Sequence, residues 1–475
     1  MNRASTDYAT RHVLSVIESD AGNAFYLDPG DSHTFYGGVP FSFRWAMLMR
    51  NRKLHWKTQA RRFRKAAITV ACATCLVTAC SRKAPSEWVF ETQARPLVDS
   101  PRSLAPQLVA LPSGVVLATA VEPGAGAYDL FFYTSPTDGD IFTMGLELNA
   151  RVGDVHPMRE GTPRLLIGRP GNYGVLWTGT APTGQGISLF FTHSEDYGHS
   201  FSPPLALDLQ SGGSHPYFNA AVTPAGTLIV VWIAYDTVKG AVPDTGVLQL
   251  IRSTDGGRSF SAPVRVAMNV CPCCRPELKT DGRGNWYLAW RHVDADQERD
   301  IVAASSSDDG ASWSAEVSVS NDGWLIDGCP DSGPSLALLD GEIFIAWHTV
   351  VSDQQKLFWS RSDGGGRYFE RRRDLAGTVR DPNHPYLVKV GEHLLVAFQG
   401  RDPDQRQGWG DQRIYLRQIA PTLSSKPIAL AHGLGSASYP VAVALGPDEL
   451  MTAWTDSSEV GDQILSVRGY LKQTP

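Results

Sequence analysis

Four cysteines have the most distinctive chemistry in the chain. Cys271, Cys273 and Cys274 lie in the run Cys-Pro-Cys-Cys-Arg-Pro, and Cys329 lies in the run Asp-Gly-Cys-Pro. Both runs precede a proline-led apolar segment, so we expect equivalent connectors to bring the four thiols near one another. In an exported protein an even number of cysteines favours disulfides, and the connectivity is not fixed by the sequence.

Two other chemistries remain open for the same cluster. Thiolates at this density could bind zinc or copper(I), with help from His215 or His348. Alternatively, two of the thiols could form a redox-active pair. No cofactor is firmly implied, and copper or zinc at the cysteine cluster is the candidate.

A second group of polar side chains lies beside the prolines and aromatic residues that punctuate the chain. Residues directly before such a proline, or directly after such an aromatic, are expected on one face of a repeat protein, around the mouth of a central channel. Arginine and histidine gather at these positions, which suits an anionic or polyhydroxylated ligand. The ligand-binding candidates are Arg159, His215, Arg275, Arg291, His348, His384 and Arg401.

The elements that must position these residues are short strands. Seven prolines, at intervals of 51–60 residues, each open an apolar alternating segment: Pro106, Pro163, Pro216, Pro276, Pro334, Pro385 and Pro440. In six of these units an apolar run ends in an aromatic residue 13–16 residues later. This repeat predicts an all-β, seven-bladed β-propeller with four-stranded antiparallel blades, with six blades as the alternative. The last unit has room for three strands, and we expect residues 88–98 to supply the fourth and close the ring.

A turn motif recurs after the third predicted strand of several units. Its pattern is Ser-x-Asp-x-Gly-x-Ser followed by Phe or Trp, with weaker copies at 135–142 and 362–369. The aspartate can accept backbone N–H groups of its own turn, and the glycine can adopt a positive φ. The structural residues of the motif are Asp196, Gly198, Phe201, Asp255, Gly257, Phe260, Asp308, Gly310 and Trp313. This motif is the Asp-box, or BNR repeat, and through it the chain resembles the sialidase superfamily.

The resemblance implies a glycan-binding protein or a diverged exo-glycosidase of the sialidase type, acting at the channel mouth. Catalytic members use a tyrosine nucleophile backed by glutamate, with an aspartate acid/base. The first arginine of their substrate-carboxylate site, in an Arg-Ile-Pro run, is absent here, because the matching run is Leu104-Ala105-Pro106. Whether the chain is an enzyme stays open and the catalytic residues are unknown. The candidates are Arg275, Arg291, Tyr217 and Tyr439.

Two other functions remain open. The first is an envelope metal-binding or thiol/disulfide protein that uses the cysteine cluster, and the second is a protein-interaction scaffold. The formal net charge is −6 and the pI is about 6.1, so the chain lacks the excess positive charge that is typical of nucleic-acid-binding proteins. We expect a monomer whose ligand is a glycan or a small anion.

The N-terminal part of the chain has the pattern of an export signal. A strongly basic run precedes the apolar residues 66–79, which are too few to span a bilayer, and the run Val-Thr-Ala-Cys ends at Cys80. We therefore expect a signal peptide over 47–79, lipidation at Cys80, a linker over 80–86 and the propeller over 87–475. Residues 1–46 are expected to be an annotation extension or disordered. These features predict a lipid anchor in a bacterial cell envelope, on the periplasmic face of the outer membrane.

Overall fold

The computed structural model describes residues 86–475, apart from 125–126, 144, 209–216, 236–237, 239, 327, 329, 405–410, 422–425 and 474–475. The predicted extension, signal peptide, lipidation site Cys80 and linker therefore lie outside the described residues, as do His215, Pro216 and Cys329. All regular structure in the described part is β-strand. It contains no helix that could cross a lipid bilayer.

The strands form antiparallel meanders in which each strand pairs with the next one along the chain. One sheet contains β3 (Leu104–Ala110), β4 (Val116–Pro123), β5 (Tyr128–Ser135) and β6 (Leu146–Glu147). The next contains β7 (Arg164–Ile167), β8 (Tyr173–Thr180), β9 (Ile187–Ser194) and β10 (Leu205–Ala206). Two further sheets contain β19 (Ser335–Leu339), β20 (Glu342–Val351), β21 (Gln354–Ser362) and β22 (Arg373–Asp374), and β23 (Arg380–Val390), β24 (His393–Arg401), β25 (Arg413–Ala420) and β26 (Ile428–Ala429).

Between these lies an eight-stranded sheet made of two such meanders. The first is β11 (Phe218–Val222), β12 (Leu228–Ala234), β13 (Gly246–Ser253) and β14 (Val264–Val270). The second is β15 (Glu277–Thr280), β16 (Trp286–Val293), β17 (Arg299–Ser306) and β18 (Val317–Ser318). A single residue pair, Val270 with His292, joins β14 to β16. The eight-stranded sheet therefore consists of two four-stranded units with a minimal link.

The last sheet combines strands from both ends of the described chain. It contains β27 (Ser436–Gly446), β28 (Glu449–Ser458) and β29 (Gly461–Gln473), with β1 (Ser86–Phe90) and β2 (Arg95–Pro96) both paired to β29. The β1 register runs from Ser86 opposite Gln473 to Phe90 opposite Gly469. Residues 88–98 thus supply parts of two short strands rather than one continuous strand.

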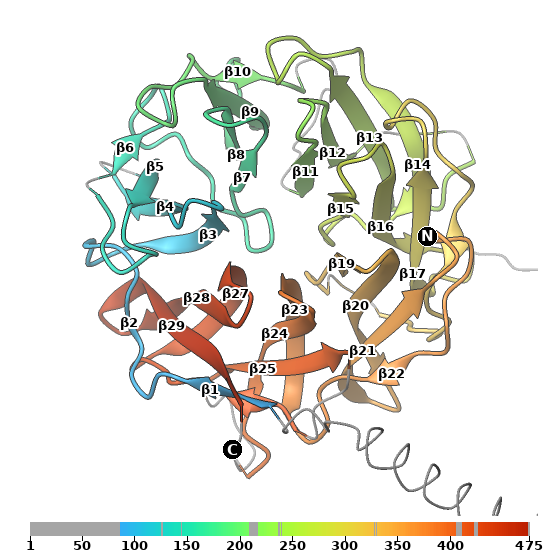
Figure 1. Cartoon of the computed structure of the whole chain (residues 1–475). Coiled ribbons are helices and arrows are strands. Elements are labelled where there is room, and N and C mark those ends of the chain that lie inside the picture. The colour runs from blue at the N-terminus through green and yellow to red at the C-terminus, as the bar shows by residue number, and fades with distance from the viewer. Residues whose placement is uncertain are drawn as a thin grey trace, which may run out of the picture. The chain divides into compact units, whose positions relative to one another are not determined.

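The sheets surround a common opening, with β3, β7, β11, β15, β19, β23 and β27 nearest to it (Figure 1). The second strand of each unit is mostly buried because neighbouring sheets cover it on both sides. Every residue of β12 is buried, for example. One hydrophobic cluster joins Leu117 and Phe132 to Val175 and Trp177 of the next sheet. The core therefore lies between sheets and leaves the inner strands free to present polar side chains to the axis.

The repeated turns hold neighbouring sheets together. In the turn after β9, the Ser200 N–H donates to Asp196 Oδ1 over 2.9 Å, and the Gly198 N–H donates to Ser194 Oγ over 2.9 Å. The Phe201 ring then contacts Phe132 of the preceding sheet, with centroids 5.1 Å apart. The same hydrogen bonds recur in the turns that contain Asp255 and Asp308. These turns thus have a structural role.

Candidate functional site

A central cavity of about 390 Å³ lies among the inner strands. Its walls come from β3, β7, β11, β15, β23 and β27 and from the residues directly before these strands. The inner strands contribute runs of adjacent residues to the lining, among them 164–167, 219–222 and 277–280. The polar lining includes Gln107, Thr162, Arg164, Asn219, Lys279 and Tyr439.

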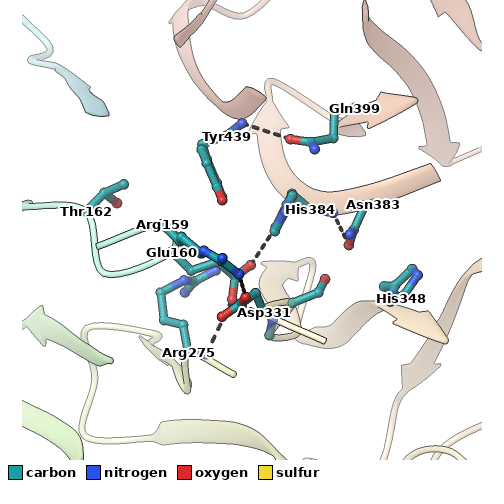
Figure 2. Close-up of polar contacts among 12 residues, drawn as sticks. Arg159, Glu160, Thr162, Arg275, Asp331, His348, Asn383, His384, Gln399 and Tyr439 are labelled. Atoms are coloured by element: carbon teal, nitrogen blue, oxygen red, sulfur yellow. Dashed lines mark hydrogen bonds and ion pairs between the residues drawn. The ribbon is translucent and has the colours of Figure 1, made fainter. Parts of the chain in front are cut away.

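Glu160 joins three distant segments beside this cavity (Figure 2). Its Oε2 accepts the Gly333 N–H over 2.6 Å and the Arg275 N–H over 3.3 Å, and its Oε1 lies 3.0 Å from His384 Nδ1. Burial alone would raise the pKa of Glu160, but the hydrogen bond from His384 and the charges of His384 and Arg275 lower it below its usual value. A carboxylate held in this way stays ionised and fixes the wall of the cavity.

Gly333 is required for this contact. A Cβ atom at position 333 would lie 2.1 Å from the Arg275 carbonyl oxygen. Only glycine lets the backbone approach closely enough for its N–H to reach Glu160.

Glu277 is the second buried carboxylate of the site. It pairs with Arg275, accepts the Asn219 Nδ2–H over 3.0 Å and lies 3.0 Å from Lys279 Nζ. Burial opposes ionisation of Glu277, but the cations of Lys279, Arg275 and Arg164 outweigh it and hold its pKa at about 2. This carboxylate therefore neutralises part of the positive charge along β15.

Arg164 contributes a cation with spare hydrogen-bonding capacity. Its NH1 donates to Thr162 Oγ1 over 3.1 Å, whereas its buried Nε has no hydrogen-bond partner among the described residues. No carboxylate of the described residues lies within ion-pair distance of it. Burial and the neighbouring Arg275 guanidinium lower the pKa of Arg164 to about 10, so it still carries its charge at neutral pH.

Two tyrosines lie near Glu160. The Tyr217 hydroxyl donates to Asp331 Oδ1 over 2.7 Å, and Asp331 is also ion-paired with Arg159. The Tyr439 ring lies 4.6 Å from the His384 ring, centroid to centroid. Burial raises the pKa of Tyr439 to about 12 and raises that of Tyr217 further. Both groups are therefore neutral hydroxyls near pH 7.

The structure brings together only part of the predicted ligand set. Arg275 and His384 meet at Glu160, and Arg159, its neighbour in the chain, pairs with Asp331 nearby (Figure 2). Arg401 instead pairs with Asp381 over 3.0 Å. It is not among the residues that line the cavity.

Arg291 and His348 are also not among the residues that line the cavity. The Arg291 side chain is fully buried and donates to the His348 and Ser332 carbonyl oxygens over 2.7 and 3.1 Å. Burial, together with the Arg291 charge, lowers the pKa of His348 to about 3. These contacts give both residues a structural role, and the ligand-binding or catalytic role predicted for them stays a prediction.

Sequence reasoning missed two charged residues that line the cavity. Arg164 and Glu277 each directly follow one of the repeating prolines, at the first position of an inner strand. The position directly after each repeating proline could therefore have predicted these two cavity residues. The prediction used the position directly before each proline instead. Glu160 has no such periodic signal because it lies in a connector.

The cysteine segment holds both bonded and free sulfurs. Cys273 is in a disulfide, whereas Cys271 and Cys274 are free and buried. The three Sγ atoms lie within 4.8 Å of one another. Because Cys329 lies outside the described residues, its predicted pairing stays a prediction. A bonded Cys273 has no thiolate to offer, so only two thiolates of this segment remain for the predicted zinc or copper site.

No protein-family model and no curated protein matches the chain. Solved structures do resemble it. A protein of unknown function from Dyadobacter fermentans is 14% identical with a TM-score of 0.44, over 82% of this chain and 99% of that one. A Hadza microbial sialidase is 14% identical with a TM-score of 0.45, over 80% and 68%. An α-L-arabinofuranosidase from Fusarium graminearum is 13% identical with a TM-score of 0.42, over 81% and 98%. Sialidases are thus among the similar structures, and likeness at this level carries no argument about the reaction.

Proposed function

We propose that this chain binds a small, anionic, polyhydroxylated ligand, such as an acidic sugar, in its central cavity. The cavity lining has three cationic side chains and two carboxylates, in addition to His384. These are Arg164, Arg275, Lys279, Glu160 and Glu277. The lining therefore has one more cation than carboxylates, and an anionic ligand would balance it.

The observation that carries the proposal is the state of Arg164. A guanidinium that loses water without gaining a carboxylate partner is costly. Its buried Nε has no acceptor among the described residues, and the Arg275 cation beside it adds repulsion. A ligand carboxylate at this point would satisfy the free N–H groups and offset both charges, which is the geometry that arginine favours.

The rest of the lining suits the hydroxyl groups of a sugar. Asn219, Gln107 and Thr162 offer donors and acceptors, and the rings of Tyr386 and Tyr439 offer flat apolar surface. This combination supports a sugar acid over a simple inorganic anion.

Binding is favoured over hydrolysis by the state of the tyrosines. A sialidase-type nucleophile must lose its proton to attack, yet burial raises the pKa of both Tyr217 and Tyr439. Tyr217 also donates to Asp331, which lies in an ion pair with Arg159. The diverged exo-glycosidase is therefore the second candidate, and its tests are release assays with sialosides and arabinosides.

We infer that the ring has seven blades and that the terminal segments close it. Seven four-stranded units result when the eight-stranded sheet is divided at its single link between Val270 and His292. Pairing of β1 and β2 with β29 supports closure of the last unit. We also propose an exported, lipid-anchored protein of the bacterial envelope, as the N-terminal sequence predicts.

The test is calorimetric titration with two sugars that differ by one carboxylate, glucuronate and glucose, with N-acetylneuraminate as a larger acid. We expect saturable binding of the acids and none of glucose. Arg164→Gln should weaken acid binding about 10- to 100-fold, the value of a charge-assisted hydrogen bond. The control is Arg283→Gln, an exposed arginine outside the cavity, which should leave binding unchanged. Equal binding of glucose and glucuronate, no binding of either acid, or an unaffected Arg164→Gln variant would refute the proposal.

A further inference from the structure

Three cysteine sulfurs meet in the connector between β14 and β15. The Cys271 N–H donates to the Arg291 carbonyl oxygen over 2.8 Å, and the Cys274 N–H donates to the Cys271 carbonyl oxygen over 3.4 Å, which closes a tight turn. The Sγ atoms of Cys271 and Cys273 are 3.8 Å apart, close to van der Waals contact. All three side chains are buried and their Sγ atoms lie within 4.8 Å of one another, so each free thiol of the turn has another sulfur of the turn close by.

The two free thiols of this turn differ in their environments. The hydrogen bond with Cys274 is the largest influence that lowers the pKa of the Cys271 thiol, and the charges of Arg291 and Arg299 lower it further against the effect of burial. Arg299 NH1 lies 3.5 Å from Cys271 Sγ. Burial raises the pKa of Cys274. Thiolate character therefore resides on Cys271, which is the attacking form in disulfide exchange, and Cys274 keeps its proton.

We propose that Cys271, Cys273 and Cys274 form a disulfide-exchange centre, in which the Cys273 disulfide and a Cys271–Cys274 disulfide interconvert. In the first step the Cys271 thiolate attacks Cys273 Sγ. A Cys271–Cys273 bond forms, the existing Cys273 bond breaks, and the former partner of Cys273 leaves as a thiolate. That partner lies outside the described residues, because the other two cysteines of the turn are free.

In the second step Cys274 gives its proton to the released thiolate and attacks Cys271 Sγ. A Cys271–Cys274 bond forms and Cys273 leaves as a thiolate. Overall, one S–S bond breaks and one forms, Cys271 and Cys274 lose two electrons, and Cys273 and its former partner gain them. The charge and the proton are conserved, so no outside oxidant or reductant is needed.

The backbone is compatible with both bonded states. Residues 271 and 274 are the first and last residues of a turn, and turns of this kind hold their end Cα atoms less than about 7 Å apart, within reach of a disulfide. Cys274 is followed directly by Arg275, whose N–H donates to Glu160. The exchange would therefore take place next to the wall of the cavity, although the chemistry does not depend on any ligand there.

The test is the connectivity of the native protein, purified without reductant. The sample is quenched in acid, denatured and alkylated with a light maleimide, then reduced and alkylated with a heavy one, and each cysteine peptide is quantified by mass spectrometry. We expect two populations, one with Cys273 bonded and one with Cys271 bonded to Cys274, the lesser at about 1% or more, a typical minor-state population. Native mass spectrometry of the same sample reports any bound metal.

Two variants separate the steps. Cys274→Ser should accumulate the Cys271–Cys273 intermediate, because the second step is blocked, whereas Cys271→Ser should keep Cys273 bonded and Cys274 free. If only the Cys273 bond is found in both the wild type and Cys274→Ser, or if a stoichiometric metal holds the thiols, the proposal is overturned. If a variant fails to fold, the connectivity of the wild-type protein alone tests the proposal. The outcome of this experiment, in either direction, does not test the proposed sugar binding.

Discussion

Replacement of Glu160 by alanine is expected to destabilise the protein strongly. The change leaves the Gly333 and Arg275 N–H groups buried without an acceptor, at about 1–3 kcal/mol each, and removes the partner of His384. We therefore expect a loss of about 3–5 kcal/mol, the range for breaking a buried charged network. Urea unfolding at constant m-value measures the loss. The control is Glu459→Ala, at an exposed position, which should change stability by less than about 0.5 kcal/mol.

The Glu160→Gln variant removes the charge of the Glu160 side chain but keeps its shape. The amide oxygen can still accept both backbone N–H groups, so we expect a smaller loss than for alanine at neutral pH. Because the folded-state pKa of Glu160 is lowered, its charge stabilises the fold above the unfolded value of 4.5, and this contribution is lost as the pH falls through the folded value. The difference between wild type and Glu160→Gln should therefore shrink on acidification. A Glu160→Ala variant as stable as the control, or a pH-independent difference for Glu160→Gln, would refute this account of the network.

Two further predictions concern the scaffold. Gly198→Ala should lower the free energy of unfolding by about 1–3 kcal/mol in urea unfolding, because φ is +83° and the new Cβ would lie 2.5 Å from the Phe132 ring. Gly184 has φ +79° but open space around it, so Gly184→Ala should cost only the backbone strain of an alanine at positive φ. Equal losses in the two variants would contradict a tight contact between the turn and the neighbouring sheet. In the wild type, His348 takes up a proton near pH 6.5 in the unfolded state and only near pH 3 in the folded state. The free energy of unfolding of the wild type should therefore fall by about 1.4 kcal/mol per pH unit as the pH drops between these values. His348→Gln should remove this contribution, so the stability of the variant should depend less on pH in this range. Unfolding curves that fall with the same slope in both proteins would argue against a neutral, buried His348.

The sequence predicts the structure best at positions where a residue type has a single local structural role. The prolines and the aromatic residues of the second strands locate the units, and the aromatic rings fill the space between sheets: Trp232, Trp347 and Trp454 are fully buried. The turn motif predicts its own hydrogen bonds, because Asp196 and Gly198 act within a few residues of each other. Local geometry of this kind needs no knowledge of the rest of the fold.

The site is less predictable because its contacts join residues far apart in the chain. Glu160 contacts Gly333 and His384, and no pattern in the sequence pairs these positions. The state of the cysteines is equally hidden, since four cysteines allow three pairings and two or more redox states. Because Cys273 is in a disulfide, the segment contains two free thiols beside a disulfide and not a cluster of three thiolates.

The contrast between Arg291 and Arg164 shows which property decides function in this architecture. Both are arginines next to a residue of the repeat, Trp290 and Pro163, and the sequence does not distinguish them. Arg291 lies on a second strand, between sheets, where backbone carbonyl oxygens accept from its NH1 and NH2 groups, and only its Nε is without a partner among the described residues. Arg164 lies on an inner strand and lines the cavity, where its NH1 donates to Thr162 Oγ1 and no backbone carbonyl oxygen of the described residues accepts from its guanidinium. Position across the sheet, rather than residue type, therefore determines which arginines can bind a ligand.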